Sequence, residues 1–211
     1  MIIKKPFFIF DFDGVICNSV KYAYYAHNLI AKKYGLSMIT SNEDFFNIID
    51  NHNLSKNIIN GDVNSYYDDF NIIYKKYLNK IKLFKYMKEL LLTNKKIVII
   101  TSNYEKFVRQ ILINNEINNS IVVIGKEMNI TKSNRLNLYI KINNINRDDI
   151  IYIGDTYDDY LFCKKEKIKM IGVNYGYSNL EKVKNELINL FYNDYDLCKY
   201  IMEVIEFYDN N

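Results

Sequence analysis

The sequence of 211 residues has no tryptophan, one proline and only three cysteines. Cys17, Cys163 and Cys198 are scattered and odd in number, which argues against a disulfide scaffold and favours free thiols in a reducing compartment. The apolar run before Asp11 is too short for the core of a secretory signal, and no segment has the uninterrupted apolar length of a membrane helix. We therefore expect a cytoplasmic protein without a membrane partner.

An excess of charge of one sign is also missing. The chain has 28 Lys and Arg against 25 Asp and Glu, a net charge of +3, and the two signs are interspersed. Without a basic patch, a nucleic-acid partner is not expected. The hydrophobic content of 49% supports a sizeable core and excludes wholesale disorder. The length fits one α/β domain with an insertion.

The chain does contain a series of short apolar runs of strand length. In order, these runs are 7–10, 97–100, 121–124, 150–153, 170–173 and 187–192. Helical patterns separate or follow them over 83–92, 104–113, 135–142, 160–165 and 195–207. Short β-branched runs without alternation are typical of strands buried on both faces. Their alternation with helices predicts an α/β fold with a Rossmann-like, doubly wound parallel sheet.

Residues 19–80 contain no such run and are predicted to be helical throughout. Ser19 can cap a helix over 20–34 that ends at Gly35, and the turn at 60–62 separates further helices. The two histidines of this stretch, His27 and His52, are interpreted as ordinary residues of the insertion.

This pattern divides the chain into two parts. Residues 1–18 and 81–211 form the Rossmann-like core, and residues 19–80 form an inserted α-helical cap subdomain. Because the insertion follows the first strand, its loops can hang over the carboxyl edge of the sheet, where ligands bind in open α/β folds. Several tyrosines of the insertion can either line a pocket or form its core: Tyr22, Tyr24, Tyr25, Tyr66 and Tyr67.

Polar side chains follow four of the predicted strands. They are Asp11 and Asp13 after the first, Thr101, Ser102 and Asn103 after the second, Lys132 after the third, and Asp155 and Asp159 after the fourth. Each group alone has an ordinary explanation as an acidic turn, a helix cap or a solvated lysine. A parallel sheet, however, brings all four strand ends to one edge. There they would supply a carboxylate nucleophile, a hydroxyl, an ammonium and metal-binding carboxylates.

Four short segments carry these side chains: DFDGVICNS, IVIITSN, ITKSN and GDTYDD. In order and spacing they resemble the four motifs of the haloacid dehalogenase (HAD) superfamily of Mg²⁺-dependent phosphatases, and the resemblance covers nearly the whole chain. The insertion resembles the helical C1 cap of that family. The segment IGVNYGYS resembles a loop of its phosphoglycolate-phosphatase-like members.

Three positions depart from the family pattern. Asn18 replaces the usual Asp of an Asp-Ser pair, and Val15 replaces a frequent Thr, but neither position supplies a group to the mechanism. Ser133 follows Lys132 where many relatives have proline, which leaves Lys126 as the alternative lysine of the third motif.

The resemblance implies a covalent mechanism. Asp11 would attack phosphorus and form an aspartyl-phosphate, which water then hydrolyses. Asp13 would protonate the leaving oxygen and afterwards deprotonate the water, so the two carboxyls must differ in protonation during the first step. Mg²⁺ would neutralise the repulsion between the nucleophile and the phosphoryl group.

The resemblance also implies two sets of ligands. For Mg²⁺ these are Asp11, the Asp13 carbonyl, Asp155 and, through the metal's waters, Asp159. For the phosphoryl oxygens they are Thr101, the amide of Ser102 or Asn103, and Lys132. The implied substrate is a small soluble phosphorylated metabolite, and we expect a monomer or a weak homodimer.

Other functions are weighed against this one. A phosphomutase of the same superfamily would use the same motifs and return the phosphoryl group to a sugar phosphate. A dehalogenase needs neither Asp13 nor a metal site, and a catalytically silent binding module has no use for an intact Asp11, Lys132 and Asp155. Cys17 does not fit a cysteine phosphatase, because no arginine follows it at the spacing of a phosphate-binding loop.

Overall fold

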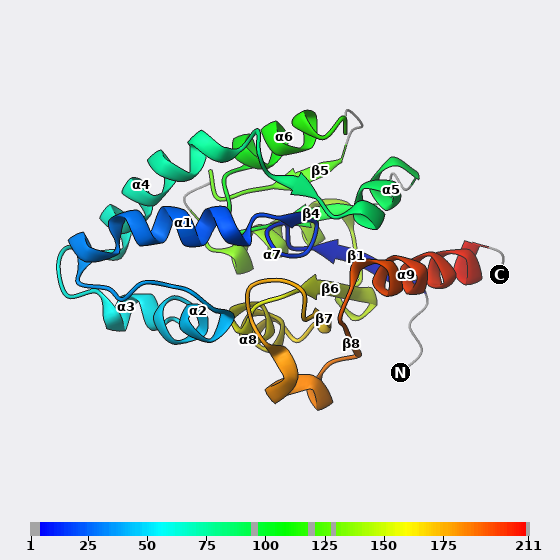
Figure 1. The fold of residues 1–211 in the computed structure, drawn as a ribbon. Coiled ribbons are helices and arrows are strands. Elements are labelled where there is room, and N and C mark those ends of the chain that lie inside the picture. Colours follow the sequence, from blue (N-terminus) through cyan, green and yellow to red (C-terminus); the bar gives the residue numbers. More distant parts are fainter. Residues whose placement is uncertain (1–4, 94–96, 118–120, 128–129, 210–211) are drawn as a thin grey trace.

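A six-stranded parallel sheet forms the centre of the computed structural model, which describes residues 5–93, 97–117, 121–127 and 130–209 (Figure 1). The ends of the predicted core, residues 1–4 and 210–211, lie outside the described residues. The strand order is β5-β4-β1-β6-β7-β8, and every neighbouring pair is parallel. The strands are β1 (Phe7–Phe10), β4 (Val98–Ile100), β5 (Val122–Ile124), β6 (Ile150–Gly154), β7 (Lys169–Val173) and β8 (Asn189–Phe191). The predicted Rossmann-like fold is confirmed, including its sixth strand.

Helices cover both faces of this sheet. They are α5 (Lys85–Thr93), α6 (Glu105–Asn114) and α9 (Asp194–Asp209) on one face, and α7 (Lys132–Asn143) and α8 (Tyr157–Glu166) on the other. Short 3₁₀ helices lie at η3 (Arg147–Asp149) and η4 (Leu180–Glu186). Along β1, Phe8 and Phe10 pack in the hydrophobic cluster beneath α5, α6 and α9, and Ile9 packs in the cluster beneath α7 and α8. The reason is that successive side chains of a strand point to opposite faces of the sheet. All three are buried, as expected for a strand in the middle of a covered sheet.

The order of the strands places a switch point at the centre of the sheet. From β1 the chain continues to β4 and β5 on one side, and then to β6, β7 and β8 on the other. The crevice outside the carboxyl ends of β1 and β6 is therefore the site at which an open α/β sheet binds ligands.

The helical insertion, residues 19–80, lies beyond that carboxyl edge, opposite the two chain ends (Figure 1). Its elements are α1 (Val20–Ile30), η1 (Ala31–Tyr34), α2 (Asn42–Ile48), α3 (Asn53–Asn57), α4 (Val63–Tyr74) and η2 (Lys75–Tyr77). It has a core of its own, in which Tyr34, Tyr66 and Leu54 are buried. Asp62 accepts hydrogen bonds from the backbone of Asn64 and Ser65 and so caps α4.

Two local expectations are corrected at the point where the insertion joins the core. Ser19 does not cap α1, because its hydroxyl is hydrogen-bonded to the Tyr177 hydroxyl at 2.9 Å. Leu83 belongs to a strand rather than to the following helix: β3 (Lys82–Leu83) pairs antiparallel with β2 (Cys17–Asn18). The chain therefore leaves and re-enters the core through a two-stranded ribbon, a pairing between residues too far apart in sequence for a local pattern to reveal.

None of the helices in the part of the chain that the structure describes is long and apolar enough to cross a membrane. The three cysteines are buried and unpaired, as predicted from their number and spacing.

The turn after β1 depends on Gly14. Its φ is +79°, and a Cβ built on it would lie 2.1 Å from Oδ2 of Asp155. We expect Gly14→Ala to lower the free energy of unfolding by more than about 2 kcal/mol, since strain at positive φ alone costs ~1–2 kcal/mol. The matched control is Gly61→Ala, where φ is +81° but the Cβ would meet only the Tyr34 ring at 3.2 Å. Urea unfolding of both variants measures the difference, and equal losses would show that the contact with Asp155 costs nothing.

Candidate functional site

A cavity of about 580 Å³ lies between the carboxyl edge of the sheet and the helical insertion. The core lines it with residues from the ends of four strands and the loops that follow: Asp11, Asp13, Thr101, Ser102, Asn103, Lys126, Lys132 and Asp159. The insertion contributes mostly apolar and aromatic side chains, among them Phe45, Tyr67, Phe70 and Tyr74. The structure thus brings together the polar strand ends that the sequence singled out. Asp155 is buried just below the cavity wall.

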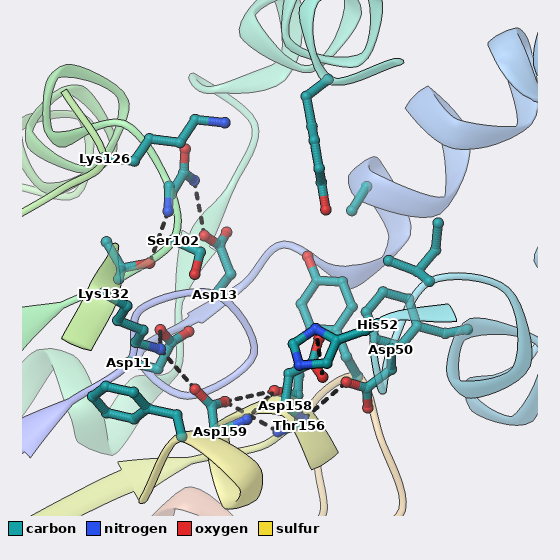
Figure 2. A pocket seen from close by; sticks show the side chains of 18 of the residues that line it. Asp11, Asp13, Asp50, His52, Ser102, Lys126, Lys132, Thr156, Asp158 and Asp159 are labelled. Carbon is teal, nitrogen blue, oxygen red and sulfur yellow. Dashed lines mark hydrogen bonds and ion pairs between the residues drawn. The ribbon is translucent and has the colours of Figure 1, made fainter. Parts of the chain in front are cut away.

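Lys132 is the central cation of the site (Figure 2). Its Nζ donates to Oδ1 of Asp159 at 2.7 Å and to Oδ1 of Asp11 at 3.1 Å. It is the first residue of α7, where Thr131 accepts a hydrogen bond from the backbone N–H of Asn134 and caps the helix. Of the two lysines considered for the third motif, Lys132 is therefore the one that contacts both carboxylates.

Tyr152 is part of the same cluster and was not recognised from the sequence. Its hydroxyl lies 3.2 Å from Oδ1 of Asp11, 3.3 Å from Oδ1 of Asp159 and 3.0 Å from the Ile100 carbonyl. The only sequence signal is its place two residues before Gly154, inside an apolar strand, where a tyrosine is normally interpreted as core. Its hydroxyl can donate to one of these three acceptors and so supports the carboxylates from below.

Burial sets the electrostatics of this cluster. It raises the pKa of Asp11 to about 6, against the opposing attraction of Lys132, and the negative charges of Asp159 and Asp13 raise it further. Burial also raises the pKa of Asp155, together with repulsion from Asp159 and Asp11. Burial alone would lower the pKa of Lys132, but attraction to Asp11 and Asp159 raises it overall and keeps this side chain charged.

A group of three buried carboxylates fits a divalent cation. One oxygen of each of Asp11, Asp155 and Asp159 lies within 4.8 Å of the others. Oδ2 of Asp155 accepts from the Tyr177 amide at 2.6 Å, but its Oδ1 is buried without a hydrogen-bond partner among the described residues. A buried carboxylate oxygen without a partner is costly, and a metal ion would satisfy it. The residues present therefore fit an Mg²⁺ ion.

The oxygens of Asp159 are already engaged. Oδ1 accepts from Lys132, while Oδ2 accepts from the Thr156 hydroxyl at 2.7 Å and the Thr156 amide at 3.2 Å. With the Thr156 hydroxyl accepting in turn from the Asp159 amide, the pair forms a capping box at the start of α8. Asp159 therefore contributes chiefly by orienting Lys132, and Asp11 and Asp155 keep the freer oxygens.

Asp13 has different surroundings from Asp11, although only one residue separates them. Its Oδ1 accepts from the Tyr74 hydroxyl at 2.8 Å, and its Oδ2 accepts from the Asn103 side chain at 2.8 Å. Tyr74 belongs to α4 of the insertion and is buried, so this contact joins the insertion to the strand end. The side chain of Asn103 holds Asp13, a contact that the sequence did not indicate, and the sequence did not mark Tyr74 as part of the site either. The expected contact between the phosphoryl group and the amide of Ser102 or Asn103 stays a prediction.

Thr101 and Ser102 directly follow β4 and line the cavity. Thr101 is buried, and its hydroxyl accepts from the Asn103 amide at 3.1 Å, which leaves the hydroxyl hydrogen free to be donated. Ser102 is exposed at the cavity surface. Buried Arg135 donates to the Thr101 carbonyl at 2.8 Å and holds this strand end from behind.

A second contact between insertion and core is made by Asp50, which the sequence did not mark. Its carboxylate accepts from the amides of Tyr157 at 2.9 Å and Asp158 at 3.0 Å, and from the Ser178 hydroxyl. These two amides are the first of α8, where the helix dipole favours a negative charge. The insertion thus caps the helix that follows the Asp155 loop.

The two histidines differ in their environments. His27 is buried, and its ring nitrogens are both occupied, Nδ1 by the Tyr66 hydroxyl and Nε2 by the Ser37 carbonyl, each at 2.8 Å. This agrees with its interpretation as an ordinary residue of the insertion. His52 lies at the cavity rim, with Nδ1 3.8 Å from Oδ1 of Asp158, and is largely exposed.

Comparison with solved structures shows the same fold in several proteins. A haloacid dehalogenase-like hydrolase from Bacteroides fragilis has a TM-score of 0.76 and 20% identity, with 92% of this chain and 100% of that chain covered. A predicted phosphoglycolate phosphatase from Haemophilus somnus has a TM-score of 0.73, 19% identity and coverages of 95% and 100%. For a predicted phosphatase from Clostridium acetobutylicum the values are 0.70, 21%, 94% and 99%.

No curated protein matches this chain in sequence. The sequence model of the family described as haloacid dehalogenase-like hydrolase does match it, over residues 8–173. That range begins within β1 and ends with β7, so it contains all four strand ends of the site. This chain therefore belongs to the haloacid dehalogenase-like hydrolase family.

Proposed function

We propose that this protein is an Mg²⁺-dependent phosphatase that hydrolyses a small soluble phosphoester through an aspartyl-phosphate on Asp11. The observation that carries the proposal is the geometry around Lys132, whose ammonium joins Asp11 to Asp159. Beside them lies Oδ1 of Asp155, which has no hydrogen-bond partner in the part of the chain that the structure describes. A nucleophilic carboxylate, a fixed cation and hard oxygen ligands for a divalent cation are what transfer of a phosphoryl group to a carboxylate requires.

In the first step, an oxygen of Asp11 forms a bond to phosphorus while the bond from phosphorus to the leaving oxygen breaks. The Lys132 ammonium stabilises the negative charge on the phosphoryl oxygens, together with the hydroxyl of Thr101 and with Ser102. Mg²⁺, held by Asp11, Asp155 and the Asp13 carbonyl, would supply the positive charge that shields the nucleophile from the phosphoryl group.

Asp13 moves the protons. It gives a proton to the leaving oxygen in the first step and accepts one from the attacking water in the second. Its carboxylate accepts hydrogen bonds from Tyr74 and Asn103, which orient it toward the cavity for both proton transfers. Asp13 is therefore held by one residue of the insertion and one of the core.

The helical insertion, residues 19–80, serves in this proposal as a cap that excludes water and selects the leaving group. Its contacts through Tyr74 and Asp50 support this role, because both reach loops of the catalytic motifs. The names of the structural neighbours, two predicted phosphatases among them, agree with a phosphatase.

The Mg²⁺ site can be tested without an activity assay. We expect Mg²⁺ to raise the melting temperature of the protein, because a ligand that binds only the folded state stabilises it. The increase should be largest above the Asp11 pKa of about 6 and should shrink as the pH falls through it, since protons then compete for the carboxylates. Without metal, the stability of the fold depends on pH in the opposite direction. A carboxyl group whose pKa is raised in the folded state stabilises the fold at low pH, and this stability is lost as the pH rises through about 6.

Asp155→Asn should abolish the Mg²⁺ effect, and the exposed Asp148→Asn should leave it unchanged. Differential scanning calorimetry across pH, with and without chelator, measures both. A melting temperature that does not respond to Mg²⁺ in the wild type would contradict the site.

Replacing the two acids of the first motif separates their roles. Asp11→Asn removes the nucleophile, so activity should fall to background and no phosphoryl-enzyme should form. Asp13→Asn retains the nucleophile, and an aryl phosphate needs little protonation of its leaving group, so the first step should partly survive. The second step lacks its base, and a labile adduct of one phosphoryl group should accumulate.

Rapid-quench mass spectrometry with an aryl phosphate detects this adduct. Formation of the adduct in Asp11→Asn would show that Asp11 is not the nucleophile. Absence of the adduct from the wild type and from both variants would contradict the covalent mechanism.

Tyr74→Phe tests whether the insertion positions Asp13. Loss of a hydrogen bond to a charged group should lower kcat/KM by about tenfold to a hundredfold for an alkyl phosphate, and by less for an aryl phosphate. Tyr22→Phe is the matched control, because its hydroxyl bonds only to the Lys80 carbonyl at the surface. Equal losses on the two substrate types would show that Tyr74 acts on stability and not on proton transfer.

A further inference from the structure

The loop after β7, residues 174–178, contacts both a carboxylate of the proposed metal site and the helical insertion. Its sequence, NYGYS, is the end of the segment IGVNYGYS, and the proposed mechanism gives this loop no part. Its last three residues, Gly176, Tyr177 and Ser178, are buried. The loop is therefore packed on both sides.

On the side of the core, the loop packs directly against Asp155. The amide of Tyr177 donates to Oδ2 of Asp155 at 2.6 Å. The backbone of Gly176 comes so close that a Cβ built on it would lie 2.1 Å from the same oxygen. The loop thus fixes one oxygen of this carboxylate, while Oδ1 has no hydrogen-bond partner among the described residues. A group that orients a metal ligand in this way changes metal affinity without touching the metal.

On the side of the insertion, two polar side chains hold the backbone of the same two residues. Nδ2 of Asn42, the first residue of α2, donates to the Gly176 carbonyl at 3.0 Å. The hydroxyl of Tyr24, in α1, donates to Oδ1 of Asn42 at 2.9 Å and lies 3.4 Å from the Tyr177 carbonyl. Helices α1 and α2 therefore reach the loop through one connected set of hydrogen bonds.

The side chain of Tyr177 is held by the insertion as well. The centre of its ring lies 5.0 Å from that of Phe45 in α2 and 6.0 Å from that of Tyr24 in α1. Its hydroxyl is 2.9 Å from the hydroxyl of Ser19, which directly precedes α1. A shift of the insertion would displace the Tyr177 amide from Asp155, because close-packed interiors transmit strain.

The contacts that Tyr74 and Asp50 make with the core reach different groups. Tyr74 bonds to the side chain of Asp13, of which the proposed metal site uses only the carbonyl. Asp50 bonds to the first amides of α8 and to the Ser178 hydroxyl. The contacts at Gly176 and Tyr177 are therefore the ones that bear on the carboxylate of Asp155.

We propose that the loop of residues 174–178 couples the position of the helical insertion to the affinity of the Mg²⁺ site, with Tyr24 and Asn42 as positioning residues. The proposal rests on the metal site of the proposed function and adds a means of regulating it. When the insertion is docked on the loop, Asp155 is held in place and Mg²⁺ binds more tightly. Because coupling between two equilibria is reciprocal, bound Mg²⁺ in turn holds the insertion in its docked position.

Asn42→Ala tests this coupling without altering the cavity or a proposed ligand. Asn42 is not one of the residues that line the cavity, and the variant keeps the capping box of Ser41 and Asp44 that begins α2. We expect the Kd for Mg²⁺ to rise about threefold to tenfold, as for the loss of one hydrogen bond. Tyr24→Phe, which retains the ring, should raise the Kd in the same direction. Calorimetric titration with Mg²⁺ measures both effects.

Asn57→Ala is the matched control. The Asn57 side chain donates to the carbonyls of Asn47 at 2.7 Å and Ile48 at 3.2 Å, so its hydrogen bonds stay within the insertion. Its Kd for Mg²⁺ should equal that of the wild type. A purely structural loss in Asn42→Ala would lower the melting temperature in chelator and leave the Kd unchanged.

The reciprocal effect is measured by amide hydrogen exchange in α2, which reports local opening of the insertion. Mg²⁺ should slow this exchange about threefold to tenfold in the wild type, the same factor as in the titration. In Asn42→Ala the slowing should be lost.

The outcomes separate the coupling from the proposed function. An unchanged Kd in Asn42→Ala and Tyr24→Phe, or an equal rise in Asn57→Ala, would overturn the coupling and leave the metal site standing. A wild type that does not bind Mg²⁺ would overturn the metal site and the coupling with it. If Mg²⁺ affinity depends on Asn42 but no phosphate ester is hydrolysed, the coupling stands and the phosphatase function falls.

Discussion

The ammonium of Lys132 offsets part of the negative charge of a cluster of buried carboxylates, and the arrangement of the carboxyl edge of the sheet depends on this interaction. Lys132 contacts Asp11 and Asp159, while Asp155 lies within reach of both acids and forms no ion pair with any residue that the structure describes. Like charges repel strongly in a medium of low dielectric constant, so three carboxylates and one ammonium leave an excess of negative charge. Burial raises the pKa values of Asp11 and Asp155, and repulsion from the neighbouring carboxylates raises them further. A divalent cation would remove this excess, and we therefore propose that metal binding stabilises the fold.

The same edge of the sheet gives Asp11 and Asp13 different surroundings. Asp11 is buried among core residues, with Lys132 and Tyr152 at its oxygens. Asp13, two positions later, is held by Tyr74 of the insertion and by Asn103. The proposed nucleophile and the proposed proton carrier need distinct environments, and contacts with separate parts of the chain supply the difference. The insertion therefore takes part in the arrangement of the site, through Tyr74 and through Asp50 at the start of α8.

The strand ends of the core differ from the part of the cavity wall that the insertion forms. The family model covers the strand ends that hold Asp11, Thr101, Lys132 and Asp155, and neighbours near 20% identity retain the fold. Aromatic rings of the insertion, such as those of Tyr67 and Phe70, line the cavity together with those strand ends. We propose that selection of the leaving group depends on these side chains, which lie outside the four motifs.

Much of the structure follows from the sequence alone. The short apolar runs identify the strands because a strand buried on both faces must be continuously apolar, and β1, β4 and β6 are such strands. The spacing of Asp11, Lys132 and Asp155 behind those runs was enough to gather them at one edge, since strands of a parallel sheet end together.

Other features were decided only by the tertiary structure. The sequence did not indicate Tyr74, Tyr152 or Asp50 as parts of the site, and it assigned the side chain of Asn103 no role toward Asp13. Their contacts join residues between 61 and 141 positions apart, and tyrosines in apolar stretches look the same whether they fill a core or point at a carboxylate. Local patterns report which face of an element is buried. Only the packing of one element on another decides which polar atom meets which, because hydrogen bonds depend on positions in space that no sequence period encodes.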